Sequence, residues 1–109
     1  MKRDLLEKNF SSILDSMNMS HLATDDNLMA DRICEASTDF EFVGKLLTGK
    51  EPHTNKDYAV EERMSAIIKD CISNLEDALR HMNDADYRYS QTVEEQLSKV
   101  IPLLKQIIG

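Results

Sequence analysis

The chain has 109 residues, of which 41% are hydrophobic and 30% charged, with only three glycines and two prolines. These values predict one globular domain over residues 1–109, and they argue against a disordered chain or a turn-rich β-sandwich. The formal net charge of −7 disfavours binding to nucleic acid or to an anionic membrane, because both need clustered Lys and Arg, and it favours a basic partner.

The first predicted helix runs from about Arg3 to Met17. Its apolar residues recur every three or four positions, as one face of a helix requires: Leu5, Leu6, Phe10, Ile13, Leu14 and Met17. Residues 18–24 are mostly polar and predict a connection. Thr24 or Asp26 can cap a second helix, whose expected core residues are Leu28, Met29, Ile33 and Ala36.

Residues 25–48 allow one helix or two. Thr38 followed by Glu41 is a capping box, which favours a new helix. The apolar spacing continues in phase through Phe40 and on to Leu47, which favours one helix. We expect a break or kink near Ser37, and a helix end at Gly49.

The stretch from Val60 to Met82 has the clearest pattern in the chain, with apolar residues along one helical face and acid-rich charges on the other. It follows a predicted loop over residues 49–56 and ends at about Asn83. The apolar stripe of this helix is widened by Ile68, Ile72 and Leu79. A stripe of that width predicts that the helix is buried on two sides, either at the centre of a bundle or in a homodimer.

A turn is predicted at residues 83–86, and a capping box at residues 92–95 starts the last helix. Pro102 should kink that helix or start a new turn. The chain is therefore expected to be all-α, a compact bundle of four to five helices, antiparallel or orthogonal, with a long central amphipathic helix.

The two cysteines, Cys34 and Cys71, fall on apolar helical stripes. We interpret both as buried free thiols rather than as a disulfide. The basic start of the chain lacks the apolar run of a secretory signal, and no segment has the ~20 apolar residues of a membrane span. A cytoplasmic location is the expectation.

Patterns that would support chemistry are weak. Asp84, Asp86 and Glu95 match positions one, three and twelve of a calcium-binding loop, but Arg88 and Tyr89 take positions five and six, where a ligand and glycine belong. The three histidines lie far apart, and no Glu-x-x-His pair, nucleophile turn or phosphate-binding loop occurs. We expect no enzyme activity, no metal site and no cofactor.

Partner binding is the function that remains. The candidate residues are acidic or aromatic and lie near the predicted connections or in an aromatic pair: Asp25, Asp26, Asp31, Phe42, Asp84, Asp86, Tyr87 and Tyr89. The sequence predicts a regulator or adaptor, of the inhibitor, immunity or chaperone type, that binds a protein with a basic surface. The alternatives are a structural assembly subunit and a metal-responsive helical protein, and a homodimer remains open.

Two short patterns resemble known families. The first pattern resembles a small enterobacterial connector family linked to biofilm and acid resistance. It comprises Leu46 to Gly49, residues 54–57 and the pairs at 67–68 and 75–76. The resemblance covers less than half of the chain and requires an insertion at residues 58–64. Residues 24–26 through 47–49 are similar to phage head–tail connectors. These resemblances imply a bacterial or phage source, and no functional residue is carried over from either.

Overall fold

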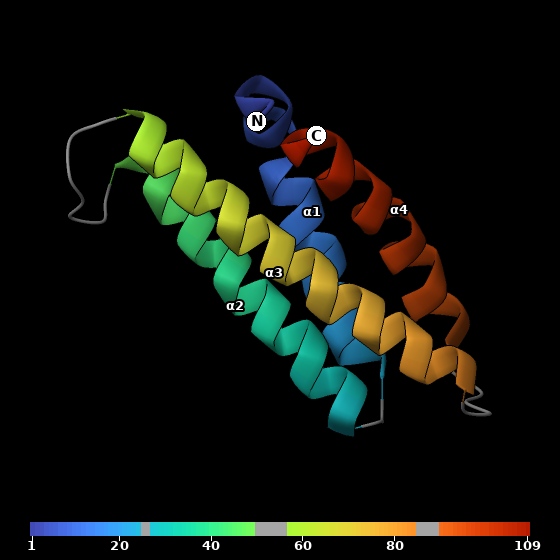
Figure 1. Ribbon diagram of the computed structural model, residues 1–109. Coiled ribbons are helices and arrows are strands. Elements are labelled where there is room, and N and C mark those ends of the chain that lie inside the picture. Colours follow the sequence, from blue (N-terminus) through green and yellow to red (C-terminus); the bar gives the residue numbers. More distant parts are fainter. Residues whose placement is uncertain (25–26, 50–56, 85–89) are drawn as a thin grey trace.

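The computed structural model describes residues 1–24, 27–49, 57–84 and 90–109, and these form four helices without a strand. The helices are α1 (Arg3–Ala23), α2 (Asn27–Thr48), α3 (Asp57–Asp84) and α4 (Ser90–Ile108). The all-α prediction is confirmed, with four helices (Figure 1). None of them is long and apolar enough to cross a membrane.

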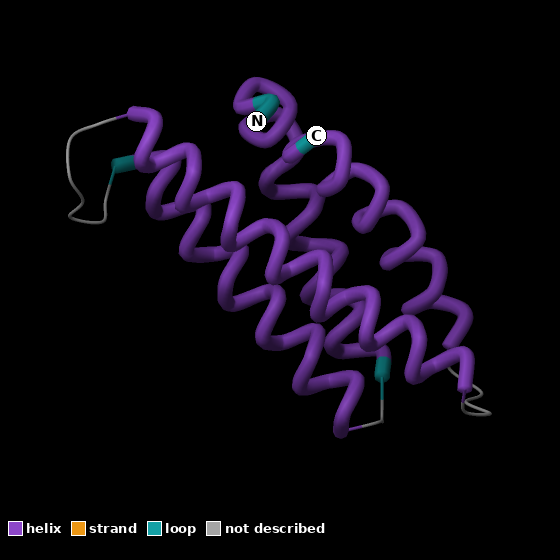
Figure 2. The backbone as a smooth tube through the Cα atoms, viewed as in Figure 1, coloured by secondary structure: helices purple, strands orange, loops and turns teal. Residues whose placement is uncertain are grey.

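The helices form an antiparallel up-and-down bundle (Figures 1 and 2). Each helix contacts the next, and α4 returns to contact α1, whereas the described parts of α1 and α3, or of α2 and α4, make no close backbone contacts. The backbone N–H of Lys2 donates to the carbonyl of Ile107 at 2.6 Å, which joins the start of α1 to the end of α4. The bundle is 47 Å long.

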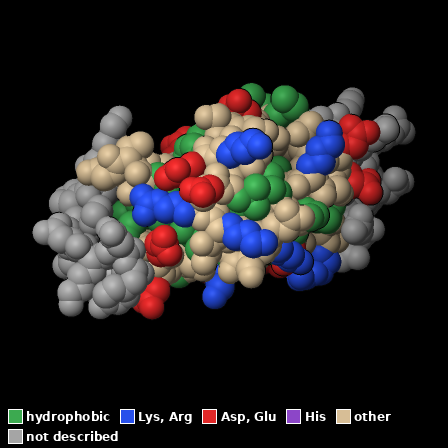
Figure 3. All heavy atoms as spheres, turned by 90° about the horizontal axis from the view of Figure 1, so that it is seen from above, with side chains coloured by type: hydrophobic (Ala, Val, Ile, Leu, Met, Phe, Trp, Pro, Cys, Tyr) green, Lys and Arg blue, Asp and Glu red, His purple; other side chains and the backbone are tan. Residues whose placement is uncertain are grey.

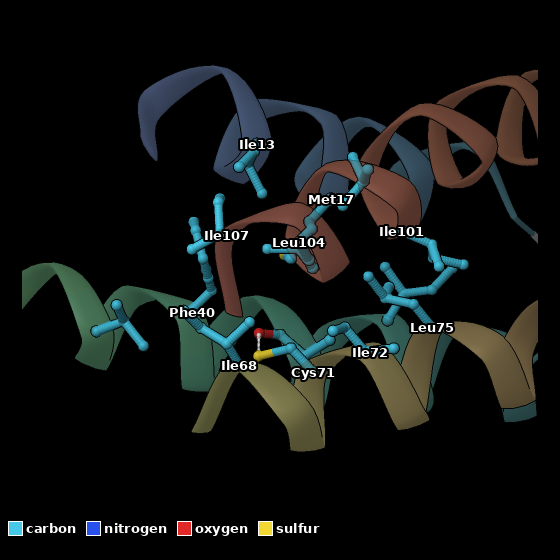
Figure 4. Close-up of a cluster of buried hydrophobic side chains, with 14 of the residues drawn as sticks. Ile13, Met17, Phe40, Ile68, Cys71, Ile72, Leu75, Ile101, Leu104 and Ile107 are labelled. Atoms are coloured by element: carbon cyan, nitrogen blue, oxygen red, sulfur yellow. Dashed lines mark hydrogen bonds between the residues drawn. The ribbon is translucent and has the colours of Figure 1, made fainter. Parts of the chain in front are cut away.

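All four helices contribute to one hydrophobic core, and Figure 4 shows side chains from each of them pointing inward. The wide apolar stripe of α3 is explained by this arrangement, because α3 packs against both α2 and α4. Ile68 and Ile72 are buried, and Leu79 is half-buried against the core. At 28 residues α3 is the longest helix, yet it shares the core with its neighbours rather than running through the middle.

The predicted end of the first helix at Met17 was wrong. α1 continues to Ala23 through residues that were interpreted as a connection. Ser20 is buried, and its hydroxyl donates to the carbonyl of Ser16 at 2.9 Å. A polar side chain can therefore enter the helix packing because its hydrogen bond is made within its own helix.

The expected break near Ser37 was also wrong, since α2 is continuous through it. The Ser37 hydroxyl donates to the side-chain oxygen of Asn18 on α1 at 2.7 Å. Packing against α1 thus buries Ser37 and supplies a hydrogen-bond partner for its hydroxyl, so Ser37 is accommodated inside a continuous helix. The helix ends where predicted: Gly49 has a φ of 70°, a left-handed conformation that suits glycine.

Two further assignments on α2 need correction. Leu28 was expected in the core but is 49% exposed, and Cys34 was expected to be buried but is exposed. The neighbours Met29 and Ile33 face the core instead, and a rotation of about 100° per residue turns the adjacent positions outward. Cys71 is buried as predicted, and both thiols are free.

Pro102 lies inside α4, which continues to Ile108. Proline removes one N–H from the helix and can clash with the preceding turn. Its side chain faces solvent, so the interruption falls on the outer side of the bundle while Ile101 and Leu104 remain in the core. The helix is therefore not split into two.

Candidate functional site

The large hydrophobic side chains that the described residues expose all lie at one end of the bundle. Met19 and Leu22 are 50% and 83% exposed on the last turns of α1, and Leu28 is 49% exposed on the first turn of α2. Single exposed hydrophobic residues are ordinary on protein surfaces, whereas exposed hydrophobic residues that are grouped together can mark an interaction site. We refer to Met19, Leu22 and Leu28 as the apolar trio.

A groove of about 270 Å³ lies between the start of α2 and the end of α3, and Leu28 is the member of the trio that lines it. Its apolar lining comes from Leu28, Met29 and Ala78, and its polar lining from Arg32, Asp77, Arg80 and His81. This volume accommodates a few side-chain atoms of a partner rather than a drug-sized ligand. We call it the end groove.

The two arginines of the end groove are paired with acids. The guanidinium of Arg80 lies 3.0 Å from the carboxylate of Asp77, and that of Arg32 lies 3.7 Å from Glu35. All four side chains are substantially exposed, so each pair contributes little to stability. The groove therefore has a nearly neutral rim around an apolar floor.

The structure brings two of the predicted partner-binding positions to this end. Asp31 is exposed on the second turn of α2, and Asp84 is the last residue of α3. Phe42 lies in the other half of α2, half-buried, with the guanidinium carbon of Arg63 at 4.9 Å from its ring centroid. The remaining five predictions lie outside the described residues: Asp25, Asp26, Asp86, Tyr87 and Tyr89.

The apolar trio was missed by sequence reasoning. Leu22 was placed in a connection because the first helix was ended too early. Had the helix been extended, its spacing from Met17 and Ile13 would have placed Leu22 on the face opposite the core. The angular positions of residues 18–23 on an extended helix therefore indicate that Leu22 is exposed.

A second group of titratable residues lies at the interface of α2 and α3. The Cys71 thiol donates to the carbonyl of Ala36 at 3.4 Å (Figure 4). Burial, with the nearby charges of Asp39 and Asp70, raises the pKa of Cys71 to about 12. Burial also raises the pKa of Asp39, and the carboxylates of Glu35 and Asp70 add to that effect.

This interface has the properties of a structural contact. A thiol with so high a pKa is almost entirely protonated at neutral pH and is a poor nucleophile. Within the described residues, no group of three or more His, Cys, Asp or Glu side chains could hold a metal ion. The calcium-loop pattern over residues 84–95 includes residues outside the described part.

Two other grooves lie away from the trio. One, between α3 and α4, has a volume of about 420 Å³ and is lined by Leu79, Ile101 and Pro102 with polar neighbours. The other, of about 360 Å³, lies beside Met1 and Glu61. On the face seen in Figure 3, charges of both signs are interspersed and the hydrophobic side chains form small separate areas.

Comparison of the chain with protein-family models, with curated proteins and with solved structures gave no match. Neither family resemblance noted from the sequence gains support from these comparisons.

Proposed function

We propose that the chain is a regulator or adaptor that binds another protein through the end of the bundle that carries the apolar trio. The observation that carries this proposal is that, among the residues whose exposure the structure describes, the exposed large hydrophobic ones all lie at that end. Protein-binding surfaces combine apolar anchors with a polar rim. The trio and the end groove supply both on neighbouring helix ends.

The energetic reason is the cost of leaving these side chains in water. Full burial of a Leu or Met side chain is worth about 1.5–3 kcal/mol. Leu22, at 83% exposure, gains almost none of this in the isolated chain. A partner that covers Leu22 and Leu28 would recover part of that free energy, which makes these two residues the expected binding anchors.

The proposal is tested by capture from the source organism with a tagged chain. The wild type should retain one partner in stoichiometric amount, and the double variant Leu22→Ser with Leu28→Ser should lose it. Gln106→Ser, an exposed change near the opposite end, should retain it. Since the exchanged leucines are exposed, both variants should give the wild-type circular dichroism spectrum.

Equal retention by the wild type and the double variant would refute the assignment of this surface. Recovery of a ring or a large oligomer of the chain alone would instead favour a structural assembly subunit. Sedimentation of the purified protein distinguishes that outcome.

A further inference from the structure

Most of the net charge carried by the described residues lies in the half of the bundle that bears the apolar trio. This acidic half consists of the described residues 14–24, 27–37, 71–84 and 90–99, which supply the second halves of α1 and α3 and the first halves of α2 and α4. These residues include eight acids and three bases, a formal charge of −5. The other described residues include eight acids and seven bases, a formal charge of −1.

The two halves act separately on an approaching molecule. The bundle is 47 Å long, whereas exposed charges are screened over about 8 Å at physiological ionic strength. A partner that reaches the trio therefore meets an acidic surface, and a partner at the opposite end meets a nearly neutral one. The paired arginines of the end groove do not cancel this excess, because they are already included in the count.

We infer that the trio and the end groove bind a basic amphipathic helix of another protein, with apolar side chains on one face and Lys or Arg beside them. This inference rests on the proposed function and names the class of partner. The apolar face would cover Leu22 and Leu28, and the basic residues would face the acidic half. Attraction between the charges would speed encounter, while the apolar contacts would slow dissociation.

A helix fits this surface better than an extended peptide does. An extended segment binds through main-chain hydrogen bonds to the edge of a sheet. The described residues offer no strand for such pairing, because each helix satisfies its own backbone. A helical partner makes its own backbone hydrogen bonds and needs only side-chain contacts, which the trio and the end groove provide.

A second copy of the chain is disfavoured by the same charges. Association of two copies through their trios would bring together two acidic halves whose described residues each carry −5, at an end where no described cluster of basic residues could compensate. Opposite charge on the partner removes this repulsion. The charge distribution therefore favours a different protein over a homodimer at this end.

The test uses two synthetic helical peptides that share the same leucine face and differ in their polar residues, lysine in one and glutamate in the other. Binding to the full chain is measured by fluorescence anisotropy at several salt concentrations. We expect the basic peptide to bind at least tenfold more tightly than the acidic one, with an affinity that falls as salt rises. The double variant Leu22→Ser with Leu28→Ser should weaken binding of the basic peptide.

A matched pair of charge variants shows where the charge acts. Reversal of Asp15, Asp31 and Glu94 to Lys changes the acidic half, and reversal of Asp4, Glu41 and Glu62 to Lys changes the net charge equally in the other half; all six residues are exposed. The first variant should slow association of the basic peptide severalfold more than the second. Equal effects of the two variants would overturn the inference.

The remaining outcomes separate this inference from the proposed function. If the leucine variant loses its cellular partner but the two peptides bind equally, the proposed function stands and the basic helix is wrong. If sedimentation shows a dimer that Leu22→Ser abolishes, a second copy is the occupant. If the leucine variant changes neither capture nor peptide binding, both proposals fail.

Discussion

The packing of Gly44 against Phe10 gives a sharp test of the fold. A Cβ atom added at Gly44 would lie closer than 3.0 Å to two atoms of the Phe10 ring. That ring cannot move freely, because it stacks on the buried Phe40 at a centroid distance of 4.8 Å. Overpacking of this kind costs roughly 1–3 kcal/mol, and the better helix propensity of Ala returns up to about 1 kcal/mol. Gly44→Ala should therefore destabilise the protein by about 1–2 kcal/mol.

The assay is urea unfolding followed by circular dichroism, with a double-mutant cycle to identify the cause. In a Phe10→Leu background the clash is removed, so Gly44→Ala should be neutral or stabilising. Ser73→Ala, an exposed change in α3, controls for helix propensity alone. A stabilising Gly44→Ala in the wild-type background, or the same effect in both backgrounds, would refute the close packing of Phe10 of α1 on Gly44 of α2.

Three further predictions concern single positions. Gly49→Ala should destabilise the protein by about 1 kcal/mol in urea unfolding, because its φ of 70° strains any residue with a Cβ; an unchanged midpoint would contradict this helix end. In native protein Cys34 should react with a thiol reagent at least tenfold faster than Cys71, as followed by mass spectrometry, since only Cys34 is exposed; equal rates would contradict the burial of Cys71. The raised pKa of Asp39 disfavours its charged form in the folded state, so its contribution to stability should fall as pH rises through the range just above 3.8. Asp39→Asn should then be more stable than the wild type at pH 7 and equally stable below pH 3.8, and a constant difference across pH would exclude the titration of Asp39 as the cause.

Much of the fold could be predicted from local pattern. The helical class follows from apolar residues at three- and four-residue spacing, and α3 begins and ends close to where that spacing does. Gly49 ends α2 for a local reason, because few other residues adopt its conformation. The errors in the helix bounds, at the end of α1 and near Ser37, occur where polar residues lie inside helices. The capping box at Thr38 and Glu41 predicted a break near Ser37, but Ser37 is buried within α2 and hydrogen-bonds to Asn18 of α1.

The candidate site was predicted less well than the fold. Acidic residues near the connections were identified, and Asp31 and Asp84 belong to helix segments at the same end of the bundle. The aromatic candidate Phe42 does not join them, because it packs with Arg63 elsewhere. The apolar trio was missed, since exposure of Leu28 depends on which way α2 is rotated against its neighbours.

The sequence by itself determined that the chain forms amphipathic helices, because helical spacing and end signals are local properties of the chain. It also determined a net charge of −7. Only the tertiary structure decided that Cys34 faces solvent, that α2 passes through Ser37 and that one half of the bundle carries most of the net charge of the described residues. The physical reason is that rotation about a helix axis and the pairing of helices distant in sequence are set by mutual packing, which no single segment encodes.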